Sequence, residues 1–185
     1  MKKCVCLIGK PNVGKSTIFN KLIKEKKSII MDEPGITRDR IYGIVNYNDK
    51  KFSLIDTGGL TSESADFNKE IRMQAELAID EADLILFVVD GKYGLDATDF
   101  YIKDLLRRTS KEVIVLVNKM DNKERLANIY EFYELGFNTV IPVSGEHNIG
   151  FREVLDAITR DITNNDSIEN HIPKFCIIGR PNVGK

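Results

Sequence analysis

The chain has 185 residues with 27 basic and 28 acidic side chains, and its net charge of −1 excludes a strong field that would draw it to nucleic acid or to an anionic membrane. Three cysteines, an odd number, provide no disulfide framework, and no apolar run reaches the length of a membrane span. With 42% hydrophobic residues the chain can still bury a sizeable core. We therefore expect a cytoplasmic, monomeric protein with no membrane partner and no direct nucleic-acid binding by this segment.

The first part of the chain predicts a strand, a helix, a loop and a hairpin. The apolar run at residues 5–8 predicts a buried strand, and apolar side chains at helical spacing predict a helix over residues 16–24. Residues 25–40 lack a clear period and predict an exposed loop. Residues 41–47 and 51–55 then predict the two strands of a hairpin.

The rest of the chain alternates helices and strands. The expected elements, in chain order, are a helix to about residue 80, a strand at 84–89, a helix at 98–108, a strand at 113–117, a helix to about 135, a strand at 140–143 and a helix at 149–162. This order predicts a three-layer α/β fold, in which helices cover both faces of a mostly parallel six-stranded sheet with one antiparallel edge strand. A ligand is expected at the carboxyl ends of the strands, where the motifs described next are found.

Residues 9–16 connect the first strand to the first helix and match the phosphate-binding pattern G-x-x-x-x-G-K-[ST]. The backbone N–H groups of such a loop and the N-terminus of the following helix favour bound phosphate. Lys15 would reach the β- and γ-phosphates, and the hydroxyl of Ser16 would bind Mg²⁺. The expected phosphate-binding residues are Gly9, Lys10, Pro11, Asn12, Val13, Gly14, Lys15, Ser16 and Thr17.

Two further segments complete the expected phosphate and metal site. Asp56 ends a strand, where its carboxylate can hold Mg²⁺ through the water shell of the ion. It is followed by Thr57, Gly58 and Gly59, and Gly59 can offer its backbone N–H to the γ-phosphate. Thr37 is the natural third Mg²⁺ contact after Ser16 and Asp56, in a loop that would order around the γ-phosphate.

The segment Asn118-Lys119-Met120-Asp121 indicates which base is bound. The carboxylate of Asp121 can accept hydrogen bonds from N1–H and the 2-amino group of guanine, whereas adenine would place an acceptor against it. The alkyl stem of Lys119 would cover the base, and Ser144-Gly145-Glu146 would supply a backbone N–H to the guanine O6. These residues predict a site for GTP or GDP.

In order and spacing, these motifs resemble the five of the P-loop GTPases, at residues 9–16, 37, 56–59, 118–121 and 144–146. Pro-Asn-Val in the phosphate loop and the run Pro-Gly-Ile-Thr-Arg-Asp-Arg at residues 34–40 resemble the Era-like branch more narrowly. Residues 179–185 repeat the phosphate loop as Gly-Arg-Pro-Asn-Val-Gly-Lys, and tandem Era-like domains are typical of the Der (EngA) family of ribosome-assembly GTPases. The resemblance implies a P-loop GTPase fold.

The same resemblance implies a domain arrangement. Residues 1–162 would be the first Era-like G domain, 163–173 a linker, and 174–185 the truncated start of a second G domain that cannot bind nucleotide by itself. We expect the chain from about residue 164 onward to be mobile or to pack as a stray strand. Members of the family also carry a complete second G domain and a KH-like domain, through which the ribosomal large subunit or its precursors would be met.

Catalysis must differ from that of Ras-like GTPases, because Leu60 stands where those proteins keep a glutamine that orients water. In several Era-like relatives a potassium ion, held partly by the phosphate-loop asparagine, takes over this task, and Asn12 is that residue here. The alternative is that Asn12 serves only the conformation of the turn. The implied catalytic set is Lys15, Thr37, Gly59 and Asn12. Leu60 belongs to the expected nucleotide-binding segment, but its side chain is expected to pack away from the nucleotide. Gly145 is a departure, because the family usually has alanine there.

Three functions remain open from the sequence. The first is a switch that hydrolyses GTP slowly, with stimulation by potassium, and acts in assembly of the large ribosomal subunit. The second is a GTP-binding regulatory module with negligible turnover, which the leucine at position 60 keeps open. The third is an Era-like GTPase with a single G domain, of the Era or tRNA-modification type, against which the repeated phosphate loop argues.

Overall fold

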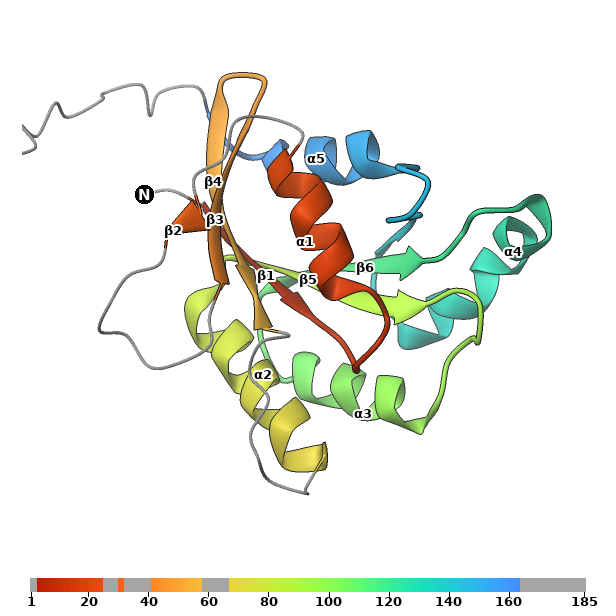
Figure 1. The fold of residues 1–185 in the computed structure, drawn as a ribbon. Helices are drawn as coiled ribbons and strands as arrows, with labels where there is room; N and C mark the ends of the chain where they lie inside the picture. The colour runs from red at the N-terminus through yellow and green to blue at the C-terminus, as the bar shows by residue number, and fades with distance from the viewer. Residues whose placement is uncertain (1–2, 25–29, 32–40, 58–66, 164–185) are drawn as a thin grey trace, which may run out of the picture.

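A computed structural model describes residues 3–24, 30–31, 41–57 and 67–163 (Figure 1). The strands are β1 (Lys3–Ile8), β2 (Ile30–Met31), β3 (Ile41–Tyr47), β4 (Lys50–Asp56), β5 (Leu84–Asp90), β6 (Glu112–Asn118) and β7 (Thr139–Pro142). The helices are α1 (Lys15–Lys24), α2 (Phe67–Glu81), α3 (Ala97–Leu106), α4 (Lys123–Ala127), the 3₁₀-helix η2 (Asn128–Leu135) and α5 (Phe151–Thr159). The expected mobility of the chain after residue 164 concerns a segment outside these residues.

The strands form one sheet in the order β2-β3-β4-β1-β5-β6-β7. β4, β1, β5, β6 and β7 pair in parallel, whereas β3 pairs antiparallel with β4. The six predicted strands and the mostly parallel sheet are therefore confirmed. The predicted exposed loop at 25–40 is wrong at Ile30–Met31, which pairs antiparallel with β3 and adds a seventh strand at the edge. The antiparallel strand β3 is consequently second from that edge.

Some predicted boundaries were also wrong, for local reasons. The hairpin strand β4 begins at Lys50, because Asn48 and Asp49 (φ 47° and 61°) make a two-residue turn whose positive φ values match the twist of the strands. The expected single helix up to residue 135 is divided into α4 and η2, since Asn128 (φ −88°, ψ 6°) leaves α-helical geometry. Helix α5 begins after residue 149 because Gly150 adopts a left-handed φ of 81° at its N-cap.

Two apolar layers enclose the sheet, as expected. Helices α1 and α5 lie on one face and α2 and α3 on the other (Figure 1). Along β5, Leu84, Leu86 and Val88 belong to the first apolar cluster, while Ile85 and Phe87 belong to the second. All seven residues of β5 are buried, which explains why this strand is a continuous apolar run rather than an alternating one.

Two expectations from composition can be checked against the described part of the chain. Cys4 and Cys6 on β1 are not joined by a disulfide; Cys6 is buried in the second apolar cluster and Cys4 packs against it, as small core residues do. No helix in the described segments has both the length and the apolar character needed to cross a bilayer.

We predict that Ile158→Ala lowers the free energy of unfolding by about 2–4 kcal/mol, because truncation of a buried aliphatic side chain loses its transfer energy and leaves a cavity. Ile158 is fully buried between α5 and the sheet. Ile149→Ala is the control, since that side chain is 44% exposed and its loss is expected to cost less than about 0.5 kcal/mol. Urea unfolding of both variants measures the difference, and equal losses would contradict this assignment of the core.

Candidate functional site

The loop between β1 and α1 curls tightly, and two glycines make this curl sterically feasible. A Cβ atom at Gly9 would lie 2.3 Å from the backbone oxygen of Val88. At Gly14, φ is 96° and a Cβ would lie 2.3 Å from Nδ2 of Asn118. The loop thus presses against the ends of β5 and β6, and glycine is required at both contacts.

Lys15 begins α1 and is buried inside this curl. Its Nζ donates to the backbone oxygens of Gly9 (2.7 Å) and Lys10 (2.9 Å). The ammonium is thus held within the loop that the sequence predicts to bind phosphate. Its place at the N-terminus of a ten-residue helix favours an anion at the same point.

Lys10 makes an ion cluster that the sequence did not indicate. Its Nζ lies 2.6 Å from Oδ2 of Asp96 and 2.8 Å from Oδ2 of Asp99, the two members of the capping box of α3. Asp99 is fully buried, and among the described residues its Oδ1 has no hydrogen-bond partner. The cluster ties the phosphate loop to the start of α3.

The pKa values of this cluster are shifted by burial and by the ion pairs. Burial raises the pKa of Asp99, and the Lys10 ammonium offsets this only in part. Burial acts in the same direction on Asp96, but hydrogen bonds from Lys10 and the backbone outweigh it and lower the pKa of that carboxyl. For Lys10 burial disfavours the charge, yet the two carboxylates raise its pKa above the usual value. The lysine therefore stays charged.

Two of the three expected magnesium ligands lie together. Ser16 Oγ donates to Asp56 Oδ2 at 2.9 Å, because β4 pairs with β1 so that Asp56 lies beside Leu7 at the start of the phosphate loop. Thr57 Oγ1 donates to the backbone oxygen of Leu7 at 2.7 Å and fixes the end of β4. A hydroxyl and a carboxylate are hard oxygen ligands that suit Mg²⁺. Thr37, Gly58, Gly59 and Leu60 lie outside the described residues.

Asn118 joins the phosphate loop to the segment after β7. Its Nδ2 donates to the backbone oxygen of Val13 at 2.8 Å, and its Oδ1 accepts from the backbone N–H of Gly145 at 3.0 Å. The side chain is buried at the end of β6. A Cβ at Gly145 would lie 2.8 Å from Cγ2 of Thr17, so the unexpected glycine fits closely against α1.

Lys119 and Met120 have separate structural contacts. Lys119 has a left-handed φ of 68°, and its Nζ donates to Asp90 Oδ2 (2.5 Å) and to the backbone oxygen of Asn12 (3.1 Å). Asp90 ends β5 directly beside Asn118 in the sheet. Met120 is buried, and its N–H donates to the backbone oxygen of Val143 at 3.0 Å. The stem of Lys119 thus spans the gap between the loops after β1 and β6.

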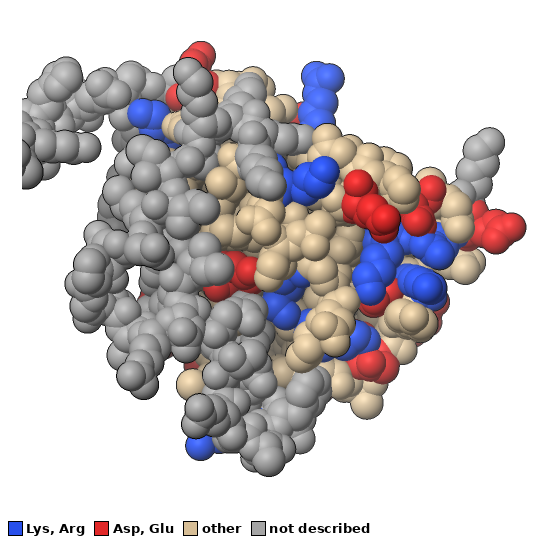
Figure 2. All heavy atoms as spheres, viewed as in Figure 1, with Lys and Arg blue, Asp and Glu red and all other residues tan. Residues whose placement is uncertain are grey.

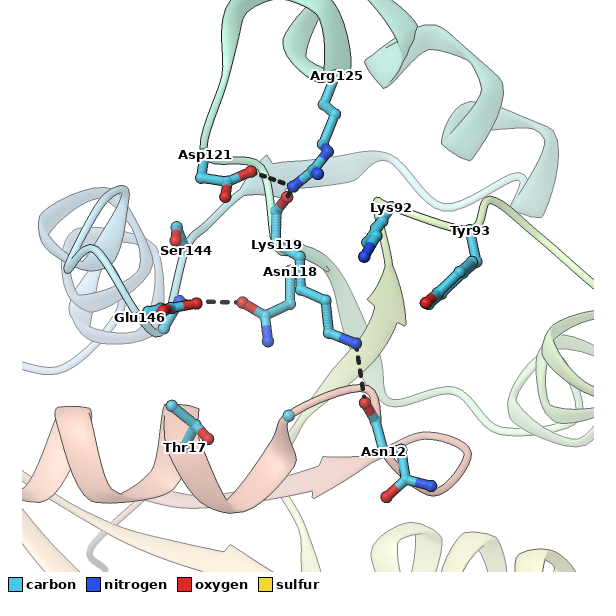
Figure 3. Close-up of a pocket in the computed structure, with 12 residues that line it drawn as sticks. Asn12, Thr17, Lys92, Tyr93, Asn118, Lys119, Asp121, Arg125, Ser144 and Glu146 are labelled. Atoms are coloured by element: carbon cyan, nitrogen blue, oxygen red, sulfur yellow. Dashed lines mark hydrogen bonds and ion pairs between the residues drawn. The ribbon is translucent and has the colours of Figure 1, made fainter.

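A cavity of about 400 Å³ lies between these loops (Figure 3). Its size falls within the range of small-molecule sites. The predicted residues that line it are Asn12, Gly14, Thr17, Asn118, Lys119, Asp121, Ser144, Gly145 and Glu146. Lys15, Ser16 and Asp56 do not line it, so the cavity matches the base and sugar end of the expected ligand. Pro11 and Glu146 are exposed, and Ser144 is buried.

Three residues of this cavity were not predicted from the sequence, namely Lys92, Tyr93 and Arg125. Lys92 and Tyr93 follow β5 at the carboxyl edge of the sheet, and this position was the signal that could have identified them. Arg125 follows Asp121 by four residues and forms an ion pair with it. On the face in Figure 2, the described basic and acidic side chains are interspersed, in agreement with the small net charge.

Comparison with known proteins decides the family. A sequence model of the family described as "50S ribosome-binding GTPase" matches residues 4–119, which is more than half of the chain. The chain belongs to this GTPase family. It is also 49% identical over 182 residues to "GTPase Der" of Streptococcus sanguinis, which covers 98% of this chain and 42% of the relative. "GTPase Der" of Finegoldia magna is 46% identical over 187 residues, covering 100% of this chain and 43% of that relative.

Solved structures agree with this GTPase family. The crystal structure of a point variant of Aquifex aeolicus Era bound to GDP·AlF4⁻ is 30% identical and has a TM-score of 0.67. The similarity covers 86% of this chain and 57% of the Era chain. The chain therefore has the P-loop GTPase fold. It spans less than half the length of the curated relatives named above.

For this GTPase-family domain we predict that Lys10→Met lowers stability by about 3–5 kcal/mol near pH 8, because it leaves the buried Asp99 carboxylate without its cation. Without Lys10 the pKa of Asp99 rises further, so the folded state binds more protons than the unfolded chain. The loss is therefore expected to shrink as the pH falls toward the usual carboxyl range and to grow as it rises.

Urea unfolding between pH 5 and pH 8 measures this dependence. Lys103→Met is the matched control, because Lys103 lies on α3 and also pairs with a carboxylate, but its partner Asp104 is 63% exposed. A loss for Lys10→Met that does not vary with pH would contradict the assigned role of Asp99.

Proposed function

We propose that this chain binds GTP and hydrolyses it to GDP and phosphate. The observation that carries the proposal is the Asn118 bridge, which places the phosphate loop and the expected guanine-reading residues around one cavity. Support comes from the family match and from the Era structure bound to GDP·AlF4⁻, a nucleotide complex of a similar domain. Guanine selectivity is assigned to the Asp121 carboxylate, which lines the cavity.

In this proposal the phosphates lie along the loop and the N-terminus of α1. Lys15 would exchange its contacts with the loop carbonyls for phosphate oxygens, where its charge stabilises the negative charge that spreads during transfer. Backbone N–H groups of the loop hold the phosphates in place. Gly59 is proposed to contact the γ-phosphate by its N–H, at a position outside the described residues.

Mg²⁺ is the expected cofactor of this site. Ser16 and Asp56 would hold it, since their oxygens already lie 2.9 Å apart, and Thr37 is the proposed third contact. When bound, Mg²⁺ neutralises charge between the β- and γ-phosphates. The position of Asp56 beside the loop is set by the pairing of β4 with β1, so the sheet itself aligns these ligands.

K⁺ is the second proposed cation, with Asn12 among its contacts. Asn12 is exposed and has a left-handed φ of 63°, the conformation that asparagine tolerates better than most residues. The turn interpretation of Asn12 thus has structural support, and only a functional test separates it from the potassium interpretation. Whether Asn12 contacts K⁺ matters because the leucine at position 60 cannot orient the attacking water.

The cellular role proposed for this domain is assembly of the large ribosomal subunit, in line with the family description. The proposed arrangement keeps residues 1–162 as the first G domain, 163–173 as linker and 174–185 as the start of a second. Contact with the ribosomal large subunit is assigned to parts of the relatives that this chain does not span. If the chain binds GTP but hydrolyses it negligibly, the alternative is that it serves as a GTP-binding regulatory module.

The proposal predicts GTP hydrolysis by this chain with Mg²⁺ that is faster in potassium than in sodium at equal ionic strength. Asn12→Ala is expected to abolish most of the potassium stimulation while preserving GDP binding. Release of phosphate over time measures the rates. Asn148→Ala is the control, since Asn148 also has a positive φ of 58° but lies outside the cavity lining. Tight GTP binding with near-zero rates in both salts would overturn the enzyme proposal and favour the binding module.

A further inference from the structure

Arg125 contacts the expected guanine-reading segment in a way that the proposed mechanism does not use. From α4 its Nη1 forms an ion pair with Oδ1 of Asp121 and donates to the backbone oxygen of Lys119 at 2.9 Å. In Figure 3 the side chain of Arg125 extends from α4 to Asp121 and to the backbone of Lys119. A single guanidinium therefore connects the side chain that reads the base to the backbone of the same loop.

These contacts leave the carboxylate able to accept from a base. The second oxygen, Asp121 Oδ2, lies 3.6 Å from Nε2 of His147, which exceeds hydrogen-bonding distance. An ionised carboxylate can accept about four hydrogen bonds, so Asp121 can keep Arg125 and still receive two donors from a base. Figure 3 shows Ser144 and Glu146 apart from Arg125, which approaches Asp121 from α4. Arg125 can therefore support the carboxylate without displacing the ligand.

The ion pair of Arg125 with Asp121 is expected to be stronger than an ordinary surface ion pair. The side chains of Arg125 and Asp121 are only 27% and 28% exposed, and both line the cavity. Partial burial reduces screening by solvent, and the second bond to Lys119 restricts the guanidinium to one place. A carboxylate held in one rotamer does not have to lose that freedom when a ligand binds.

We propose that Arg125 is a positioning residue that orients Asp121 and thereby sets selectivity for a base with adjacent N1–H and 2-amino donors. This inference rests on the proposed function, because it requires that Asp121 reads guanine. It assigns to Arg125 a contribution to selectivity and not only to stability. The distinguishing ligand is IDP, whose base keeps N1–H but lacks the 2-amino group.

Calorimetric titration of the full chain with Mg·GDP and with Mg·IDP tests the proposal. Wild type is expected to prefer GDP. In R125Q the affinity for GDP is expected to fall about tenfold, the scale of one charge-assisted hydrogen bond, and the preference for GDP over IDP about fivefold. R125K keeps the charge but replaces the planar guanidinium, whose Nη1 makes both contacts, with a flexible ammonium, so its preference is expected to lie between those of R125Q and wild type.

The matched control is R72Q. Arg72 pairs with Glu76 at the same spacing of four residues, but on α2, with exposures of 65% and 57%. It is expected to leave both affinities unchanged. Thermal unfolding of each variant, without nucleotide, checks that it is folded. If R125Q does not fold, the preference of R125K for GDP over IDP is the test.

The titration results distinguish a failure of the role proposed for Arg125 from a failure of nucleotide binding itself. An unchanged ratio of GDP to IDP affinity in R125Q, with or without an equal loss for both nucleotides, overturns the inference. Tighter GDP binding by R125Q also overturns it, because Arg125 would then compete with the base. A preference of R125K equal to that of wild type contradicts the assignment of the orienting role to the guanidinium of Arg125. Failure of wild type to bind GDP would instead overturn the proposed function.

Discussion

The site depends on the side-chain amide of Asn118. It satisfies the backbone oxygen of Val13 and the backbone N–H of Gly145, groups that belong to loops far apart in the sequence. An amide offers both a donor and an acceptor, so neither aspartate nor leucine could make both bonds. Because the side chain is buried, loss of either bond would also leave a buried polar group unsatisfied. The relative position of the two loops, and hence the cavity between them, follows from this residue.

The parallel sheet explains why polar residues can be buried around that amide. Asp56, Asp90 and Asn118 all end strands, and the pairing of the strands places Asp56 beside Leu7 and Asp90 beside Asn118. Each carboxylate then meets a donor from a neighbouring segment, Ser16 in the first turn of α1 for Asp56 and Lys119 after β6 for Asp90. The cost of burying these groups is offset by the bonds they make with one another. These polar strand ends, which would be unfavourable in an apolar core, thus form a connected layer of hydrogen-bonded side chains.

Prediction from sequence succeeded for motifs whose residues are contiguous in the chain. It failed for contacts between residues that only the fold brings together. The phosphate loop and the segment at 118–121 are local patterns, and the sequence alone places both at the carboxyl edge of the sheet. The contact of Lys10 with Asp99 joins residues 89 positions apart, and no periodicity reveals it. Strand β2 has only two residues, too few for an apolar pattern, and exists because β3 offers its edge. Arg125 lay outside the motif, although its position four residues after Asp121 could be seen in the sequence.

The cations around the phosphate loop also explain how a chain of net charge −1 can present an anion site. Lys10 is neutralised by the capping box of α3, and Lys119 is paired with Asp90. Their charges therefore hold loops in place instead of creating a long-range positive field, consistent with the mixed charges on the surface in Figure 2. In the proposed site, attraction for phosphate would then come from short-range groups, namely the loop N–H donors, the start of α1 and Lys15. Such groups act only on a ligand that already lies in the loop, so selectivity in the proposed site would depend on shape and hydrogen bonding more than on charge.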